Sequence, residues 1–129
     1  MLEFKDTPWG RWEVLLDAPY CKVKRIIVHP GGRLSYQKHF KREELWTIVQ
    51  GHATVTLDGK IHVYREGETV FIPKEAAHRV ANEHKKPMVF IEIQRGSYFG
   101  EDDIVRLEDD YGRVNDHHNG TGTDEISSA

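Results

Sequence analysis

Short segments in which apolar and polar residues alternate recur along the chain up to about residue 100, and turn-forming residues separate them. A period of two is typical of β-strands, whereas no segment in this region shows the 3.6-residue period of an amphipathic helix. The strongest hairpin signal is Asp58-Gly59, which joins two such segments. Short strands at near-regular spacing predict an all-β fold, an antiparallel barrel or jelly roll. The predicted strands cover residues 11–17, 22–28, 33–41, 44–50, 53–57, 61–64, 70–72, 78–82 and 89–94.

The two ends of the chain depart from this pattern. Pro8 and other turn-forming residues interrupt the first ten positions, so we predict an N-terminal arm there, with Trp9 and Trp12 packed against the core. After residue 100 the chain is acidic but keeps apolar residues, which indicates a short packed segment. We therefore predict one domain over residues 1–113, including the arm and the acidic segment, and a disordered tail over residues 114–129.

Charge and composition exclude several classes of protein. The 18 basic and 21 acidic residues give a net charge of −3, which provides no electrostatic basis for nonspecific nucleic-acid binding. The single cysteine, Cys21, cannot form an internal disulfide, and the first ten residues lack the apolar core of a signal peptide. No apolar run approaches the roughly 20 residues that span a bilayer. We expect a cytoplasmic protein that binds neither nucleic acid nor membrane.

Four side chains in two segments suit a metal site. Because alternate residues of a strand face the same side, Gln37 and His39 are expected to point together, and Glu44 to return from the partner strand of one short β-hairpin. His78, which follows a second turn-rich segment, is the candidate fourth ligand. These residues predict a site for one divalent metal ion; the alternative is a buried polar cluster.

The same residues match the two motifs of the cupin superfamily, which the chain therefore resembles. The first motif, G-x5-H-x-H-x(3,4)-E-x6-G, is met with Gln37 in place of its first histidine, and a neutral amide oxygen is a harder ligand that suits a soft or redox-active metal less well. The second, G-x5-P-x-G-x2-H-x3-N, is met with Glu75 in a turn position where glycine is usual. The resemblance implies a double-stranded β-helix, that is, a jelly-roll barrel. The matching positions are Gly31, Gln37, His39, Glu44, Gly51, Gly67, Pro73, His78 and Asn82.

Three longer segments resemble the cupin domain of type II mannose-6-phosphate isomerases. They are VKRIIVHPGGRLSYQKH, IPKEAAHRVAN and IEIQRGSYFGEDDIVRLEDDYGR, and the resemblance runs from Pro8 to Arg113. In that family the domain often follows a mannose-1-phosphate guanylyltransferase half, but no glycine-rich nucleotidyltransferase loop occurs in this chain. The resemblance therefore implies isomerase activity alone, interconverting mannose 6-phosphate and fructose 6-phosphate on a free-standing domain.

Such an isomerisation moves a proton between C1 and C2 through an enediol, so it needs a base and a group that stabilises an enolate oxygen. A divalent metal bound by the four candidate ligands would polarise the sugar carbonyl as a Lewis acid. Two nitrogen and two oxygen ligands suit zinc, which we expect, as well as Co, Mn, Ni or Fe(II).

A phosphorylated sugar also needs cationic partners. Lys22, Lys24 and Arg33 lie on or beside strands expected to line the barrel mouth, although charged strand residues are equally often exposed. Arg106 and Arg113, in the acidic segment, are expected either to clamp the phosphate or to pair with the neighbouring aspartates.

The candidate base is Glu92. Alternation along FIEIQ places it on one face of a strand with Phe90, and burial there would raise its pKa; an exposed position is the alternative. Lys24, Lys38 and Tyr36 are rival candidates. Lys24 and Arg106 complete the predicted catalytic set.

Two other functions remain open. His39, Glu44 and His78 would also provide the facial triad of an iron oxygenase, and a cupin that lacks metal or base would serve as a sugar-binding module. We further expect a homodimer. The N-terminal arm, with Phe4 and Trp9, is a candidate for exchange across its interface, because proteins tend to cover unpaired sheet edges.

Overall fold

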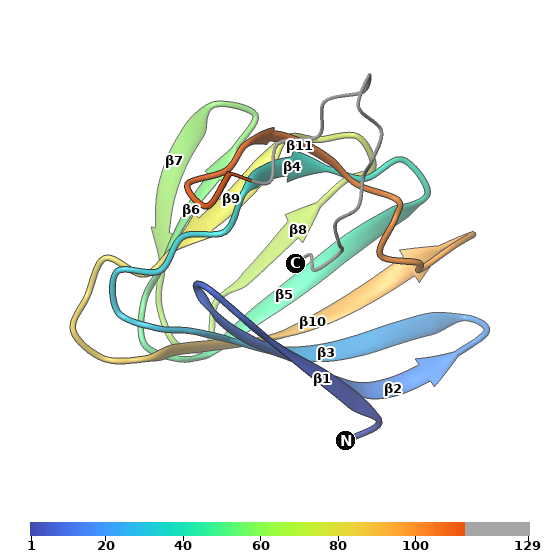
Figure 1. Ribbon diagram of the computed structural model, residues 1–129, viewed down its shortest axis with the longest axis horizontal. Helices are drawn as coiled ribbons and strands as arrows, with labels where there is room; N and C mark the ends of the chain where they lie inside the picture. The colour runs from blue at the N-terminus through green and yellow to red at the C-terminus, as the bar shows by residue number, and fades with distance from the viewer. Residues whose placement is uncertain (113–129) are drawn as a thin grey trace.

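A computed structural model describes residues 1–112, which form eleven β-strands and no helix (Figure 1). Arg113 and the predicted tail, residues 114–129, lie outside the described residues. The predicted all-β fold class is confirmed. The strands are β1 (Glu3–Thr7), β2 (Gly10–Ala18), β3 (Cys21–Val28), β4 (Tyr36–Lys38), β5 (Arg42–Gln50), β6 (Ala53–Leu57), β7 (Lys60–Tyr64), β8 (Thr69–Ile72), β9 (His78–Ala81), β10 (Met88–Gly96) and β11 (Val105–Glu108).

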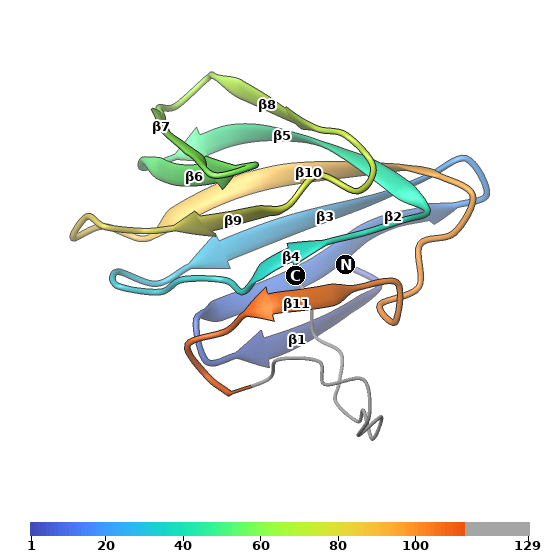
Figure 2. The same cartoon turned by 90° about the horizontal axis from the view of Figure 1, so that it is seen from above.

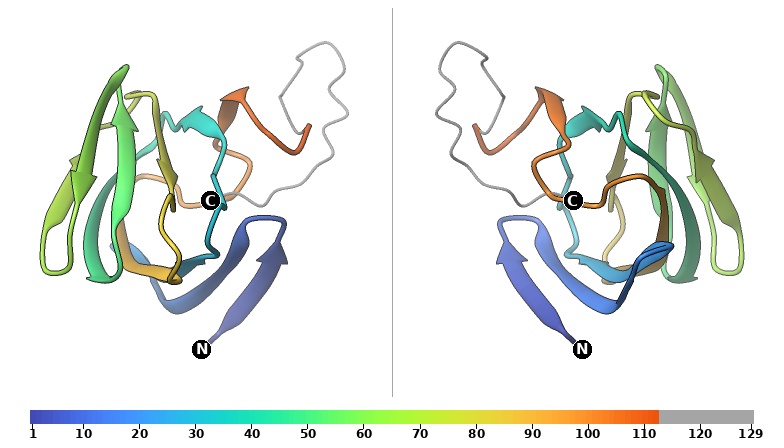
Figure 3. Two further views of the ribbon diagram at one scale, coloured as in Figure 1. Left: turned by 90° about the vertical axis from the view of Figure 1, so that its left-hand side faces the viewer. Right: turned by 90° about the vertical axis from the view of Figure 1, so that its right-hand side faces the viewer.

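The strands form two antiparallel sheets that face each other. One sheet has six strands in the order β1-β2-β3-β10-β5-β8, and the other has five in the order β11-β4-β9-β6-β7. The end-on views show the two sheets curving around a common interior (Figure 3), and the view from above shows β3, β10 and β5 side by side as the middle of the larger sheet (Figure 2). The chain passes repeatedly from one sheet to the other, which is the topology of a double-stranded β-helix.

Alternate residues of the strands point inward and build the apolar core. In β5, for example, Trp46 and Ile48 are buried whereas Leu45 and Val49 are exposed. The predicted packing of Trp9 and Trp12 is confirmed, since both belong to the core cluster with exposed fractions of 1% and 3%. Burial of these side chains between the sheets is the main stabilising contribution to the fold.

The N-terminal arm contains a strand that alternation did not reveal. Residues Glu3–Thr7 pair with residues 10–14 of β2. The residues that interrupt the pattern make the tight turn between these two strands, in which the N–H of Gly10 donates to Thr7 Oγ1 at 3.1 Å. Trp9 in this turn is buried in the core and so anchors the hairpin of β1 and β2. β1 forms one edge of the six-stranded sheet.

The predicted hairpin between residues 33–41 and 44–50 is wrong. Only Tyr36–Lys38 of the first segment is a named strand, and β4 belongs to the five-stranded sheet, whereas β5 belongs to the six-stranded sheet. Alternation identifies strand residues but not their partners, and residues 39–41 cross between the sheets instead of forming a hairpin turn. Gln37 and Glu44, both buried, therefore come from opposite sheets.

The acidic segment after residue 100 packs as predicted, and part of it forms β11. This strand pairs with β4, which places Arg106 opposite Gln37. The preceding residues 97–104, which we call the strap, connect β10 to β11 and are fastened to the crossing segment 39–41 (Figure 1).

Within residues 1–112, two turns have left-handed backbone at residues other than glycine. The predicted Asp58-Gly59 hairpin turn is confirmed, with φ values of 47° and 82°. Glu75 has a φ of 67°, so the position where the cupin motif usually has glycine does require the conformation that glycine favours. The N–H of Glu75 donates to the carbonyl of His39 at 2.7 Å, so this strained turn supports a candidate ligand.

Candidate metal centre

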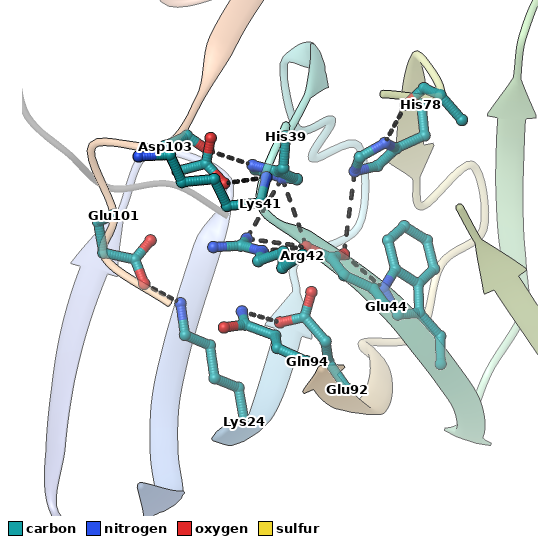
Figure 4. A network of polar contacts seen from close by, with 12 residues as sticks. Lys24, His39, Lys41, Arg42, Glu44, His78, Glu92, Gln94, Glu101 and Asp103 are labelled. Carbon is teal, nitrogen blue, oxygen red and sulfur yellow. Dashed lines mark hydrogen bonds and ion pairs between the residues drawn. The ribbon is translucent and has the colours of Figure 1, made fainter. Parts of the chain in front are cut away.

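Three predicted ligands converge in the interior between the sheets (Figure 4). His39 follows β4, Glu44 lies on β5 and His78 begins β9, and their ligand atoms all lie within 4.8 Å of one another. The Nε2 atoms of His39 and His78 lie 3.4 Å and 3.9 Å from the two carboxylate oxygens of Glu44. All three side chains are at most 3% exposed. We call these three residues the ligand cluster.

Backbone carbonyls fix the tautomer of both imidazoles. Nδ1 of His39 lies 2.6 Å from the carbonyl of Asp103, and Nδ1 of His78 lies 2.9 Å from the carbonyl of Ala76. A carbonyl only accepts, so each Nδ1 carries the proton and each Nε2 presents a lone pair toward Glu44. Such an outer hydrogen bond is the usual support of a metal-bound histidine.

Burial keeps both imidazoles neutral. Desolvation, with the nearby Arg42 guanidinium, lowers the pKa of His39 to about 3, and desolvation likewise lowers the pKa of His78. Burial alone would raise the pKa of Glu44, but Arg42, the hydrogen bond with Glu92 and the two histidines together hold that pKa well below its usual range. The cluster thus contains two neutral imidazoles and one carboxylate, the protonation states that metal binding needs.

Gln37 is placed where it can complete the set. It lies opposite His78 in the pairing of β4 with β9 and is 3% exposed. Directly opposed residues of paired strands present their side chains on the same face. Its amide is therefore a neighbour of the ligand cluster, contributed by the five-stranded sheet.

Arg42 and Trp46 position Glu44 from the same strand. Arg42 Nε donates to Glu44 Oε2 at 2.8 Å, and Trp46 Nε1 donates to Glu44 Oε1 at 2.9 Å. Arg42 Nη2 also lies 3.2 Å from His39 Nε2 and donates to its lone pair. A metal ion at His39 would use that same lone pair, so the metal bond and this hydrogen bond exclude each other.

The residues present fit a divalent cation. Nε2 of His78 is buried and has no hydrogen-bond partner within residues 1–112, which is the condition of a ligand atom directed at an ion. Imidazole nitrogens with a carboxylate and an amide oxygen are a donor set for zinc or another divalent transition metal.

A second carboxylate lies beside the cluster. Glu92 on β10 is 3% exposed, accepts from Gln94 Nε2 at 3.1 Å, and shares a hydrogen bond with Glu44. Desolvation and the negative charge of Glu44 raise the pKa of Glu92 well above its ordinary value. Glu92 is therefore buried, as predicted, and not at an exposed strand position. In the strand register Glu92 lies between Lys24 and Trp46.

The predicted cationic residues divide into two groups. Lys24 is fully buried on the inner face of β3, beside Glu92, and Lys22 lies two residues away on the same face. Arg106 is buried next to Gln37. Arg33 is placed elsewhere, because it is partly exposed and forms a two-bond ion pair with Asp110 at 2.8 Å and 2.6 Å.

Sequence reasoning did not identify three residues of the site. Arg42 lies two residues before Glu44 on β5, and this spacing could have indicated that both side chains share the inner face. Glu101 and Asp103 of the strap contact Lys24 and His39. Contacts this remote in sequence leave no local pattern.

The fold and the ligand cluster together define a cupin, a double-stranded β-helix with a candidate metal site in its interior. More specifically, the chain belongs to the mannose-6-phosphate isomerase C-terminal family, whose model matches residues 4–109. The predicted resemblance is therefore confirmed.

Curated relatives are longer proteins of bacterial carbohydrate metabolism. The chain is 46% identical over 106 residues to a mannose-1-phosphate guanylyltransferase of Klebsiella pneumoniae, and 48% identical over 107 residues to the alginate biosynthesis protein AlgA of Pseudomonas aeruginosa. These matches cover 82% and 83% of the chain but only 22% of either relative.

Solved structures with lower identity share the fold. A double-stranded β-helix protein from Klebsiella pneumoniae superposes with a TM-score of 0.66 at 20% identity, over 74% of this chain and 76% of that one. An oxalate decarboxylase from Lactobacillus farciminis superposes with a TM-score of 0.72 at 22% identity, over 81% of this chain and 33% of that one. No helix within residues 1–112 has the length and apolar content that crossing a membrane requires.

Proposed function

We propose that this domain is a divalent-metal-dependent aldose–ketose isomerase that interconverts mannose 6-phosphate and fructose 6-phosphate. The observation that carries the proposal is a cluster of two neutral histidines and one carboxylate. A second carboxyl group with a raised pKa, that of Glu92, is hydrogen-bonded to this carboxylate. The family description and the mannose phosphate in the name of the Klebsiella relative support a mannose phosphate as the substrate.

The proposed metal site consists of Gln37, His39, Glu44 and His78, with zinc as the expected ion. When bound there, a divalent cation supplies Lewis-acid polarisation of the sugar carbonyl. The two backbone carbonyls that hold the imidazole Nδ1 protons leave both Nε2 atoms unprotonated, as coordination of the ion would require.

Glu92 is the proposed base. It takes the proton from C2 of the aldose and returns it at C1, and the same carboxyl acts in reverse for the ketose. An ordinary glutamate is a poor proton donor at neutral pH, but burial and the charge of Glu44 raise the pKa of Glu92 and bring it closer to that of a useful acid–base group.

Positive side chains around the cluster bind the rest of the substrate. Nη1 of Arg42 is buried without a hydrogen-bond partner among the described residues, so it has a donor available for the oxygen that becomes negative in the enediolate. Lys24 and Lys22, on the same inner face, are proposed to bind the phosphate, and Arg106 lies on the opposite sheet.

Metal content tests the ligand assignment. Purified chain should hold one divalent ion, and His39→Ala or His78→Ala should weaken its affinity by more than the roughly 10- to 100-fold cost of losing an outer partner. His62→Ala, on the exposed face of β7, is the control and should keep full occupancy. Far-UV circular dichroism should remain β-rich, because the apolar core does not depend on the ion. Full occupancy in both cluster variants would remove the assignment.

An activity assay separates the three functional classes. The metal-loaded protein should convert mannose 6-phosphate and act far less well on mannose, because binding energy from the phosphate orients the sugar. Oxygen consumption with a sugar substrate would favour an oxygenase instead. Saturable binding of mannose 6-phosphate without turnover would favour a binding module.

A further inference from the structure

The strap, residues 97–104, passes beside the ligand cluster, where Glu101 and Asp103 lie near Lys24 and His39 (Figure 4). The side chain of Asp103 accepts from the backbone N–H groups of Phe40 at 3.0 Å and Lys41 at 2.9 Å. Its carbonyl accepts from His39, and the N–H of Ser97 donates to the carbonyl of Lys41 at 3.0 Å. Hydrogen bonds at Ser97 and at Asp103 therefore hold the strap to residues 39–41, the segment that crosses between the sheets.

Between these fastenings, Glu101 reaches the buried lysines. Nζ of Lys24 donates to Glu101 Oε2 at 2.5 Å, and Nζ of Lys22 lies 3.8 Å from the same oxygen. The side chain of Lys24 is completely buried, whereas that of Glu101 is 17% exposed. Glu101 is therefore the partly exposed partner of a fully buried ammonium group.

Three positive groups act on Glu101. Burial alone would raise the pKa of Glu101, but Lys24, Arg42 and Lys22 lower it to about 2. A buried ammonium group without a counter-ion is costly, so a carboxylate from the chain stabilises Lys24 when no other anion is bound.

We propose that Glu101 is an exchangeable counter-ion which occupies the binding place of the substrate phosphate and determines the specificity of the site for doubly charged anions. This inference rests on the proposed function, since it assumes a phosphosugar substrate. A phosphate dianion carries more charge than one carboxylate and offers three oxygens to Lys24 and Lys22, so it can replace Glu101. A neutral sugar or a weak monoanion gains too little to do so.

The alternative role for Glu101 is a fixed ion pair that holds the strap in place. The two roles predict opposite effects of removing the charge. If Glu101 competes with the ligand, Glu101→Gln binds phosphate more tightly; if Glu101 only fastens the strap, the variant binds phosphate equally or more weakly.

Calorimetric titration of the full chain with inorganic phosphate tests the proposal. Glu101→Gln should bind phosphate about tenfold more tightly than the unaltered chain, because a charge-assisted competitor has been removed. Asp102→Asn is the matched control: it removes the same charge from the next residue, whose carboxylate is exposed and accepts from Tyr98 at 2.5 Å. Its phosphate affinity should stay within about twofold, since solvent and salt screen the charge of an exposed carboxylate.

Equal or weaker phosphate binding by a folded Glu101→Gln variant would overturn the proposal. Should that variant not fold, amide hydrogen exchange on the unaltered chain gives a second test: saturating phosphate should speed exchange at residues 101–103, and unchanged or slower exchange would contradict displacement. Inorganic phosphate undergoes no isomerisation, so these results stand whether or not the chain turns over mannose 6-phosphate.

Discussion

At the scale of single residues, the site depends on where two protons are held. The carbonyls of Asp103 and Ala76 each retain an imidazole Nδ1 proton, and burial resists the addition of a second proton. The ligand cluster therefore stays ready for a cation at pH values where an exposed histidine is charged. The same arrangement has a measurable effect on stability.

The metal-free protein should lose stability as pH falls below 6.5. The pKa of His39 is about 3 in the folded chain and about 6.5 in the unfolded chain, so below 6.5 the unfolded chain binds the extra proton. Between pH 6.5 and pH 5 this residue lowers the free energy of unfolding by about 1.5 kcal/mol. Urea unfolding in the presence of a chelator measures this effect. Between pH 6.5 and pH 5, the free energy of unfolding should fall less in His39→Gln than in the unaltered chain, by the amount given above. His62→Gln is the control, and equal losses in all three proteins would contradict the neutral buried His39.

Glu92 should matter for the rate and not for substrate affinity. If it is the base, Glu92→Gln removes proton transfer and should lower kcat by about 100-fold or more, with KM changed little. Glu43→Gln is a matched control, because Glu43 lies nearby on the outer face of β5, where it pairs with Arg95 at 3.3 Å. Steady-state kinetics with mannose 6-phosphate provides the measurement. A KM effect alone would assign Glu92 to binding.

Motif spacing located His39, Glu44 and His78, because both cupin motifs fix their places along the chain. It did not indicate that Arg42 holds Glu44, since an arginine two residues before a glutamate is equally compatible with a solvated strand. The ion pair between Lys24 and Glu101 joins residues 77 positions apart, and no local pattern encodes such a pair.

At the scale of elements, the turn before β9 carries strain next to a ligand. Glu75 has a φ of 67°, and left-handed backbone costs a residue with a side chain about 1–2 kcal/mol. A glycine at this position would avoid that cost, but its greater freedom in the unfolded chain would offset part of the stabilisation. Glu75→Gly should therefore raise the free energy of unfolding by up to about 1 kcal/mol.

Thermal unfolding measures this effect, with a rise in Tm of a few degrees expected for a domain of this size. Lys74→Gly, one residue earlier and not in the left-handed region, is the control and should lower Tm. A lower Tm for Glu75→Gly as well would show that the side chain of Glu75 contributes more than its backbone costs.

Alternation and turn signals predicted most strands but failed at two elements for different reasons. β1 is short and exposed along most of its length, so its polar positions do not follow a buried face. Residues 33–41 look like a continuous strand, yet the chain must leave the five-stranded sheet after Lys38 to reach the other sheet. Which sheet a strand joins depends on long-range pairing, which periodicity does not contain.

At the scale of the whole molecule, β1 and β7 are sheet edges with exposed apolar side chains. Phe4 on β1 is 50% exposed and Ile61 on β7 is 69% exposed. Because an unpaired sheet edge favours association, we expect two copies of the chain to meet along β1, the strand of the predicted N-terminal arm. Trp9 is packed in the core, so Phe4 is an exposed apolar side chain that the arm can offer to a second copy.

Sedimentation velocity tests this association. The chain should sediment as about twice its 15.0 kDa mass at micromolar concentration, Phe4→Glu should shift it toward the monomer, and Ile61→Glu should leave it unchanged. A single 15.0 kDa species in the unaltered protein would rule out a stable dimer.

The proposed isomerisation requires a proton to move between C1 and C2 of a mannose phosphate in this cupin interior, and nuclear magnetic resonance in D₂O follows that proton. Metal-loaded protein mixed with mannose 6-phosphate should produce fructose 6-phosphate, with solvent deuterium appearing at C1 because Glu92 exchanges its proton with water between removal and return. His78→Ala, which loses a proposed ligand, should do neither. Mannose 6-phosphate that binds the metal-loaded protein and yet yields no fructose 6-phosphate and gains no deuterium at C2 would contradict the proposed isomerase activity.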